Sequence, residues 1–201
     1  MRTLTRFFKK NFNFKNTESY KYVVEAGEKS KNITQYYKMI RFLTSINVDR
    51  NDLIIVLGGG VVGDLAGFIA STYMRGIDYI QVPTSLLAMV DSSIGSKTAI
   101  NTEDGKNLIG SFYAHKAVFI DLDFLKTLPQ EEFTNGLAEI IKCSIIKDKN
   151  LFDLINEEEI YDRNTLSNII KMKLLTLQVL RLKISMKMWT LILLVNLILE
   201  L

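Results

Sequence analysis

The 201-residue sequence is poor in cysteine, histidine and proline, and each shortage excludes a class of protein. The single cysteine, Cys143, rules out a disulfide framework and suits a reducing compartment, so we expect a cytoplasmic protein. The single histidine, His115, rules out a zinc finger or a His-rich metal cage made by this chain alone. With two prolines and eleven glycines, the chain is too poor in both residues to be a collagen-like or low-complexity sequence.

Strong charge and long apolar runs are also missing. A net charge of +3, without basic clusters that alternate with aromatic residues, argues against a nucleic-acid partner. The apolar run at 189–199 is shorter than the roughly 20 residues that span a bilayer, so we expect no membrane partner and interpret it as a buried or interfacial helix. Residues 1–13 lack the apolar core of a secretory signal, although a transit peptide stays open.

With 48% apolar residues, the chain can bury a core, and hydrophobic periodicity predicts alternating strands and helices. Short apolar runs indicate strands at 20–25, 52–57, 79–82 and 117–121, and the run at 52–57 is typical of a strand buried on both faces of a parallel sheet. Helical spacing predicts helices over 31–45 and 61–73, and Pro129 begins another. Residues 53–82 therefore form one βαβ unit with an expected right-handed crossover, and a loop-rich stretch follows it.

The segment Gly58-Gly-Gly60-Val-Val-Gly63 fits the pattern G-x-G-x-x-G between a predicted strand and a predicted helix. In that context glycines admit a pyrophosphate, and free N–H groups at the helix start hold its charge. A tight turn with close packing is the alternative, because small residues form one helix face at Gly63, Ala66, Gly67 and Ala70. The acid expected for a ribose about 20 residues later is Asp78, but it lies in a predicted turn. Asp64 must have its own partner, such as a ribose hydroxyl or an amide.

Two further groups of polar residues carry chemistry. Lys97 and Lys106 lie near glycines, where ammonium and backbone N–H groups can together bind an anion. The alternative interpretation is that both lysines are solvated and bind no ligand. Glu139 and Lys142 are three residues apart and share a face of the helix after Pro129. They form either a surface ion pair or a metal-binding carboxylate with a lysine close by.

Over about residues 27–156, the sequence resembles a known family. The resemblance depends on consecutive blocks: GGGVVGDLAGF, YMRG, QVPTSLLAMVDSSIGSKTAIN, GKNLIGSF, IDLDFLKTLP and GLAEIIK. The sequence is similar to 3-dehydroquinate synthase of the shikimate pathway. The resemblance implies an α/β fold: a Rossmann-like parallel-sheet domain that binds NAD, followed by the start of an α-helical metal-binding domain. It also implies a lyase that converts 3-deoxy-D-arabino-heptulosonate 7-phosphate to 3-dehydroquinate and phosphate. The unbroken VDSSIG and GKNLIG blocks favour it over related sugar-phosphate cyclases and the glycerol-dehydrogenase group.

Carried over by position, the resemblance implies cofactor contacts at these residues: Glu28, Lys31, Gly60, Val61, Val62, Gly63, Asp64, Thr84, Ser85, Lys97, Lys106, Phe124, Leu125, Lys126 and Thr127. It implies catalytic or substrate-contacting roles for a second set: Arg75, Asp91, Lys97, Lys106, Asn107 and Lys142. Arg75 would reach the phosphate across a homodimer. Glu139 would be the first of three ligands of Zn²⁺ or Co²⁺.

The sequence also departs from the family. Ser96 replaces a glycine, which would cost about 1–2 kcal/mol if that position needs a positive φ angle. His115 stands about where a proline is frequent, and we expect it on the surface. The first strand and helix of the family are missing before Tyr20. Residues 163–199 contain no acid, glycine or proline, as a frame change or a truncated gene would produce, and the family's two histidine ligands do not occur there.

These observations divide the chain into three parts: an incomplete NAD-binding domain at 1–125, the start of a helical metal and substrate domain at 126–171, and an atypical apolar, basic tail at 172–201. With Glu139 as the single metal ligand, we expect this chain alone to be inactive on the phosphorylated sugar acid. The alternatives are a related sugar-phosphate cyclase or a catalytically dead remnant that still binds nucleotide.

Overall fold

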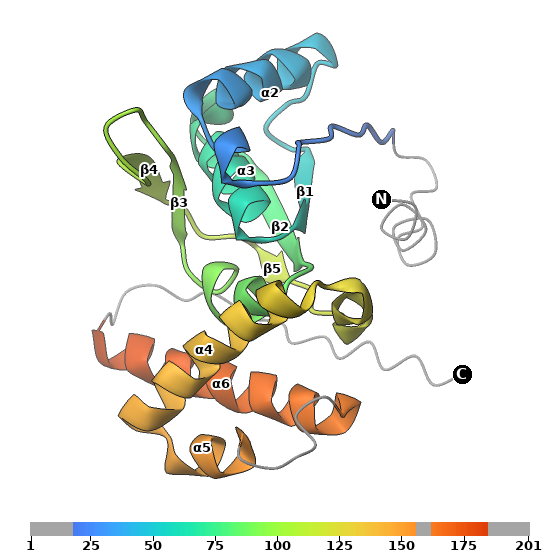
Figure 1. The fold of residues 1–201 in the computed structure, drawn as a ribbon. Helices are drawn as coiled ribbons and strands as arrows, with labels where there is room; N and C mark the ends of the chain where they lie inside the picture. Colours follow the sequence, from blue (N-terminus) through green and yellow to red (C-terminus); the bar gives the residue numbers. More distant parts are fainter. Residues whose placement is uncertain (1–17, 156–161, 185–201) are drawn as a thin grey trace.

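A computed structural model of the protein describes residues 18–155 and 162–184 (Figure 1). The predictions for residues 1–13 and for the apolar run at 189–199 lie outside these residues. The described chain has an α/β part and, beyond it, a group of three helices. No helix in the described ranges is both long enough and apolar enough to cross a membrane.

The centre of the α/β part is a parallel sheet in the order β1-β2-β5. Strand β1 (Leu53–Gly58) pairs with β2 (Asp78–Pro83) along its whole length, and helix α3 (Gly60–Thr72) connects them, which confirms the predicted βαβ unit. Strand β5 (Ala117–Val118) is shorter than predicted. Strand β1 is also not buried along both faces, because Val56 is its one buried residue and Leu53 is 49% exposed.

Helix α2 (Ile33–Ser45) packs on the outside of α3 and begins at the cap Asn32, whose side chain accepts a hydrogen bond from the Gln35 N–H group at 2.8 Å. The strand predicted at 20–25 does not form. Val24 packs against the core under α2, but no strand among the described residues pairs with this segment. The apolar pattern was therefore a signal of packing rather than of sheet pairing.

The stretch between β2 and β5 is more regular than predicted. It contains one π-helical segment, η3 (Ala88–Ser92), and an antiparallel hairpin of β3 (Lys97–Ile100) and β4 (Ile109–Phe112). Strand β3 lies against α3, where a Cβ atom at Gly67 would come within 2.5 Å of Thr98 Cγ2. Elsewhere, the α/β part contains three short 3₁₀ segments: η1 (Glu28–Ser30), η2 (Tyr73–Arg75) and η4 (Leu122–Thr127).

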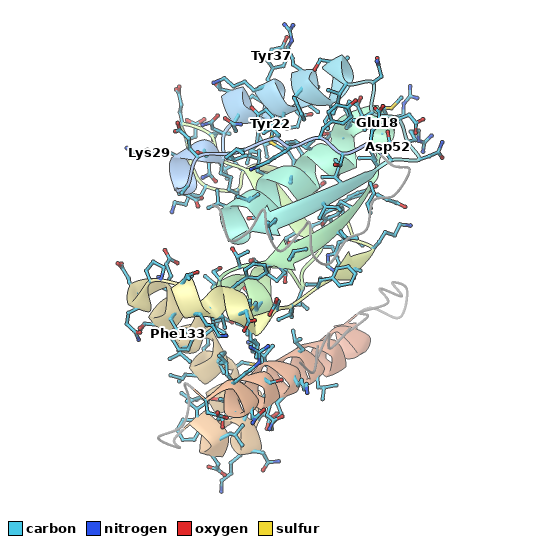
Figure 2. All side chains as sticks on the ribbon, turned by 90° about the vertical axis from the view of Figure 1, so that its right-hand side faces the viewer. Glu18, Tyr22, Lys29, Tyr37, Asp52 and Phe133 are labelled. Carbon is cyan, nitrogen blue, oxygen red and sulfur yellow. The ribbon has the colours of Figure 1, made fainter. Side chains whose placement is uncertain are left out.

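The helical part consists of α4 (Gln130–Lys147), α5 (Lys149–Ile155) and α6 (Arg163–Ile184). Both views show α4 nearest to the sheet, with α5 and α6 beyond it (Figures 1 and 2). The two parts share one hydrophobic core, in which Leu86, just before η3, and Met89 of η3 cluster with Ile140 of α4 and Ile169 of α6. Helix α6 continues past residue 172, where we expected an atypical tail to begin, and Leu174 is fully buried.

Candidate functional site

The glycine loop lies at the carboxyl end of β1. Gly59 caps α3 without a side-chain hydrogen bond, and the first hydrogen bond of the helix runs from the Gly63 N–H group to the Gly59 carbonyl at 3.1 Å. The N–H groups of Gly60, Val61 and Val62 in the first turn have no earlier carbonyl within the helix. Such N–H groups, at the positive end of the helix dipole, are the kind that bind anions.

Close approach explains why these positions are glycines. A Cβ atom at Gly59 would lie 3.3 Å from Ser85 Oγ, and one at Gly60 would lie 3.0 Å from Ser92 Oγ. At Gly63 the contact would be with Gln81 Oε1 of β2 at 2.9 Å. The two interpretations of the glycine motif are therefore compatible, since the same residues pack closely and leave the helix amides open.

Two predicted cofactor contacts meet this loop from the end of β2. The Thr84 N–H group donates a hydrogen bond to the Gly58 carbonyl at 3.0 Å, and Ser85 faces Gly59. Ser92 Oγ, which faces Gly60, is buried and has no hydrogen-bond partner among the described residues. Buried hydroxyl groups are usually paired, so this one marks a place for a polar ligand atom.

A pocket of about 510 Å³ adjoins the loop and contains four predicted site residues: Asp64, Asp91, Lys97 and Asn107. They come from α3, η3, β3 and the turn before β4, segments that are far apart in the sequence. Lys106 is exposed beside this pocket but does not line it. The fold thus gathers two carboxylates, an ammonium group and an amide around one cavity.

Within the described chain, the partner of Asp64 is Lys31, which was not identified from the sequence. The Lys31 Nζ atom lies 2.5 Å from Asp64 Oδ2 and 2.5 Å from Asn107 Oδ1, and Lys31 is only 4% exposed. Burial raises the pKa of Asp64 above its usual value although the Lys31 ammonium lowers it, and the negative charges of Glu28 and Asp91 raise it further. This wall of the pocket has an excess of negative charge.

Glu28 reaches the same region through Asn101. The Asn101 side-chain amide donates to Glu28 Oε1 at 2.7 Å, and Asn101 Oδ1 accepts from the Asn107 N–H group at 2.9 Å. Asn107 has a φ angle of 61°, in the left-handed region that asparagine tolerates. A hydrogen-bonded chain therefore joins η1 to the turn that holds Asn107.

Of the two departures from the family, Ser96 does not meet the condition for strain, and the expectation that His115 lies on the surface is wrong. Ser96 does not have a positive φ angle, so it causes no backbone strain of that kind. His115 is buried, with 4% exposure, and its ring meets the edge of Tyr79 at a centroid distance of 6.0 Å. The fold covers this histidine because the loop before β5 runs beside the Tyr79 ring of β2.

The remaining predicted contacts lie away from the pocket. Arg75 is exposed at the opposite end of α3 from the glycine loop. Phe124 and Leu125 of η4 belong to the hydrophobic core, while the exposed Lys126 pairs with Asp123 at 3.0 Å. Thr127 is exposed at the end of η4. The structure does not bring these residues to the lining of the pocket.

The predicted metal ligand, Glu139, is flanked by two lysines. Lys142 lies 3.2 Å from Oε2, as the helical spacing predicts, and Lys173 of α6 lies 3.5 Å from Oε1. Sequence reasoning missed Lys173, although it continues the apolar stripe of Leu166, Ile169 and Ile170 at helical spacing. Within residues 18–155 and 162–184, no three His, Cys, Asp or Glu side chains converge to hold a metal ion.

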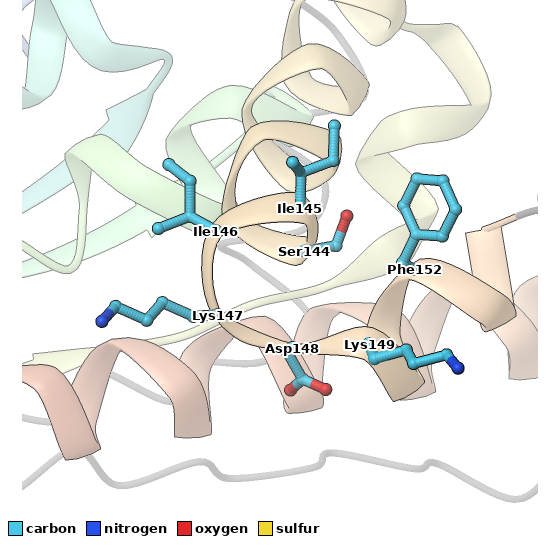
Figure 3. A pocket seen from close by; sticks show the side chains of 7 residues that line it. All are labelled: Ser144, Ile145, Ile146, Lys147, Asp148, Lys149 and Phe152. Atoms are coloured by element: carbon cyan, nitrogen blue, oxygen red, sulfur yellow. The ribbon is translucent and has the colours of Figure 1, made fainter.

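A second hollow, of about 450 Å³, lies where α4 turns into α5 (Figure 3). Ile145 and Ile146 line it with Lys147, Asp148 and Lys149, and Ile145 is 68% exposed. None of the predicted site residues lies in it.

Comparison with known proteins supports the arrangement. The family described as 3-dehydroquinate synthase N-terminal matches residues 21–135. A 3-dehydroquinate synthase of Prochlorococcus marinus subsp. pastoris is 53% identical over 140 residues, which are 70% of this chain and 39% of that protein. The chain thus spans about two fifths of the length of that curated relative.

Two solved structures share the fold. One is ValA, a 2-epi-5-epi-valiolone synthase from Streptomyces hygroscopicus subsp. jinggangensis with NAD⁺ and Zn²⁺ bound, at a TM-score of 0.74 and 30% identity over 77% of this chain and 45% of that chain. The other is a 2-deoxy-scyllo-inosose synthase complexed with carbaglucose-6-phosphate, NAD⁺ and Co²⁺, at a TM-score of 0.76 and 27% identity over 88% of this chain and 50% of that chain.

Proposed function

The chain belongs to the 3-dehydroquinate synthase family, and from this premise we propose that residues 1–125 form its NAD-binding part and that residues from 126 onward begin its metal- and substrate-binding part. Because α6 crosses residue 171 without a break, residues 172–184 belong with the helical part. The proposed reaction is the conversion of 3-deoxy-D-arabino-heptulosonate 7-phosphate to 3-dehydroquinate and phosphate in the cytoplasm.

The observation that carries the proposal is the open first turn of α3 at the carboxyl end of a parallel strand. Its glycines form a cradle that a Cβ atom would fill, and the unpartnered Ser92 hydroxyl faces that cradle. Ligands of α/β sheets bind at this edge, with the pyrophosphate at the helix N-terminus. These features fit NAD, which when bound would accept a hydride from a ring carbinol of the substrate and later return it.

The chain's own residues would then bind and orient. The amides of Gly60, Val61 and Val62 would hold the pyrophosphate charge, with Ser85 beside them. Lys97 in the pocket and Lys106 at its edge would hold anionic groups of the ligands, while Asp91 and Asn107 would orient substrate hydroxyl groups. Such fixed charges stabilise a transition state most where the site is organised beforehand.

The metal is a different case. Catalytic zinc takes three protein ligands, and the described residues offer the Glu139 carboxylate between two ammonium groups. This donor set does not fit, so we derive no step through a metal. Lys142 is assigned to substrate by resemblance, but here its ammonium group faces Glu139.

We also propose a homodimer. Arg75 lies in η2, after the end of α3 that is opposite the glycine loop, and does not line the pocket; its exposed position supports the expectation that it serves the partner's site. Light scattering measures the molar mass in solution of the purified chain and of its Arg75→Ala variant. A monomer that still binds NAD would contradict the dimer but not the cofactor site.

NAD binding is tested by calorimetry on the full chain. Gly60→Ala should weaken binding at least about tenfold, because its Cβ atom enters the cradle and disturbs charged hydrogen bonds. The matched control is Gly105→Ala, whose Cβ atom would meet only the Leu108 side chain, at 3.2 Å. Absence of binding at millimolar NAD, or equal weakening by both changes, would contradict the proposal.

A second candidate is a related sugar-phosphate cyclase, favoured by the two solved structures. Thermal unfolding with NAD, in the presence of the heptulosonate phosphate or of sedoheptulose 7-phosphate, separates the two. Stabilisation by the second sugar alone would favour the cyclase.

Turnover is a separate prediction. We expect no sustained phosphate release from this polypeptide alone with NAD, zinc and the heptulosonate phosphate, because the described residues supply no group of three ligands around Glu139. Release well above a metal-free control would show that the prediction is wrong.

A further inference from the structure

Glu139 lies between two cations that differ sharply in burial. Lys142 reaches its Oε2 atom from the same helix and is 66% exposed, while Lys173 reaches Oε1 from α6 and is 1% exposed. Lys173 also donates a hydrogen bond to the backbone carbonyl of Glu139 at 3.3 Å. Lys142 also lies 3.5 Å from Oε1, so both oxygens of the carboxylate already have an ammonium partner.

Burial keeps Lys173 at this place. Ile169, Ile170 and Leu174, on the same face of α6, are all buried in the core shared with α4. An ammonium group in such surroundings is stable only while it is paired, because leaving water carries a large free-energy cost. Glu139 supplies both of its observed contacts, the side-chain oxygen and the carbonyl.

A divalent cation would meet unfavourable surroundings here. It would have to approach a carboxylate that two positive charges already neutralise, and repulsion between like charges opposes this. The nearest sulfur donor in sequence, Cys143, is buried and lies about 100° further around α4 than Lys142. Within the described ranges, Glu139 belongs to no group of three His, Cys, Asp or Glu side chains that could hold a metal ion.

We propose that Lys173 is the built-in counter-ion of Glu139, so that in this chain the carboxylate joins α4 to α6 and does not bind a divalent metal. The inference uses the proposed function only for the expectation that Glu139 would be a metal ligand. The helical part is then stabilised by an internal ion pair, and it folds without a metal ion.

The first measurement is thermal unfolding of the full chain after EDTA treatment, with and without Co²⁺, together with the visible absorption of Co²⁺. We expect a change in Tm below about 1 °C, since a ligand that does not bind the folded state cannot stabilise it, and no protein-dependent absorption band. A rise in Tm with Co²⁺ that Glu139→Gln abolishes would overturn the proposal. NAD calorimetry on the same sample reports separately on the cofactor site.

The second measurement compares the two lysines. Lys173→Met should lower Tm by about 10 °C, because it leaves a carboxylate without its buried partner. Lys142→Met, on the same carboxylate, should lower it by about 3 °C or less, since exposed ion pairs contribute little. Equal effects of the two substitutions would overturn the proposal.

A third variant keeps the test valid if Lys173→Met does not fold. The double change Lys173→Met with Glu139→Leu removes both charges and should recover most of the lost Tm, as apolar replacement of buried pairs does. If the double variant is as unstable as the less stable of its two single variants, the two residues do not act as a pair and the proposal is wrong.

Discussion

Each part of the molecule buries one lysine against a carboxylate that stays about one-fifth exposed. In the α/β part, Lys31 at 4% exposure meets Asp64 at 23%, and in the helical part Lys173 at 1% meets Glu139 at 22%. The surroundings differ in sign. Lys31 has acids around it, because Glu28 and Asp91 act on Asp64, whereas Glu139 has a second ammonium group from Lys142.

This difference decides what each pair can do. The excess of acceptors around Lys31 leaves hydrogen-bonding capacity for a ligand, and Asp64 opens to the pocket. Around Glu139, two ammonium groups already bind the carboxylate. The Lys173–Glu139 pair therefore connects two helices. One type of ion pair thus organises a site in one part and replaces a site in the other.

The largest effect should come from removing Lys31. Lys31→Met leaves Asp64 and Asn107 without their shared donor and should lower the free energy of unfolding by about 3–5 kcal/mol. Urea denaturation measures this change. The control is Lys29→Met, on the same 3₁₀ segment but exposed, which should be within about 0.5 kcal/mol of the original chain. Similar losses of stability in both variants would show that Lys31 is not a buried, paired lysine comparable to Lys173.

Glycine contacts test how tightly each part is packed. Gly136→Ala should lower stability by about 1–3 kcal/mol, because its Cβ atom would lie 2.6 Å from the Leu86 side chain and 2.7 Å from the Leu87 backbone nitrogen. Gly67→Ala should cost less, since one contact there is below 3 Å, at 2.5 Å to Thr98 Cγ2, whereas Gly136 has three such contacts, one of them with backbone. Calorimetric unfolding ranks the two changes, and the reverse order would show the α/β part to be the more rigid one.

Alkaline pH should act on the α/β part through Tyr79. Burial raises the pKa of Tyr79 to about 12, whereas a tyrosine in the unfolded chain titrates near 10. The folded state therefore keeps a proton that the unfolded state loses, and stability falls by about 1.4 kcal/mol from this group between pH 8 and pH 11.

Tyr79→Phe should remove that part of the pH dependence, as urea denaturation at the two pH values would measure. Tyr113→Phe is the control: Tyr113, whose ring stacks on that of Tyr79 at 5.9 Å, is only half-buried, and so the change should be smaller. The helical residues 126–155 and 162–184 contain no tyrosine. An unchanged slope in Tyr79→Phe would show that other groups cause the alkaline loss.

The smallest effect concerns the exposed link between η4 and α6. Hydrogen bonds from Lys126 and Arg163 lower the pKa of Asp123, so the stability it contributes is present above pH 4 and is lost as pH falls through the lowered pKa. Because solvent screens these half-exposed groups, Asp123→Asn should cost less than about 1 kcal/mol at pH 7. Urea denaturation in 1 M salt should show a still smaller cost, and an undiminished one would contradict the screening argument.

Much of the fold follows from local patterns. The βαβ unit, the glycine loop and the Glu139–Lys142 pair each depend on spacings of a few residues that a helix or strand fixes by its own geometry. The strand predicted at 20–25 failed because an apolar alternation cannot reveal whether a neighbouring strand is available. The β3–β4 hairpin was not predicted, because its sequence, with glycines and lysines, resembles a loop. It forms a hairpin where β3 packs on α3.

The sequence by itself determined where an anion can bind, because a strand, three glycines and a helix start are consecutive in the chain. Only the tertiary structure decided which charges meet. Lys31 and Asp64 are 33 residues apart, Lys31 and Asn107 are 76 apart, and Lys173 and Glu139 are 34 apart. No periodicity encodes such pairs, since they form where separate elements pack and where burial makes an unpaired charge too costly to remain.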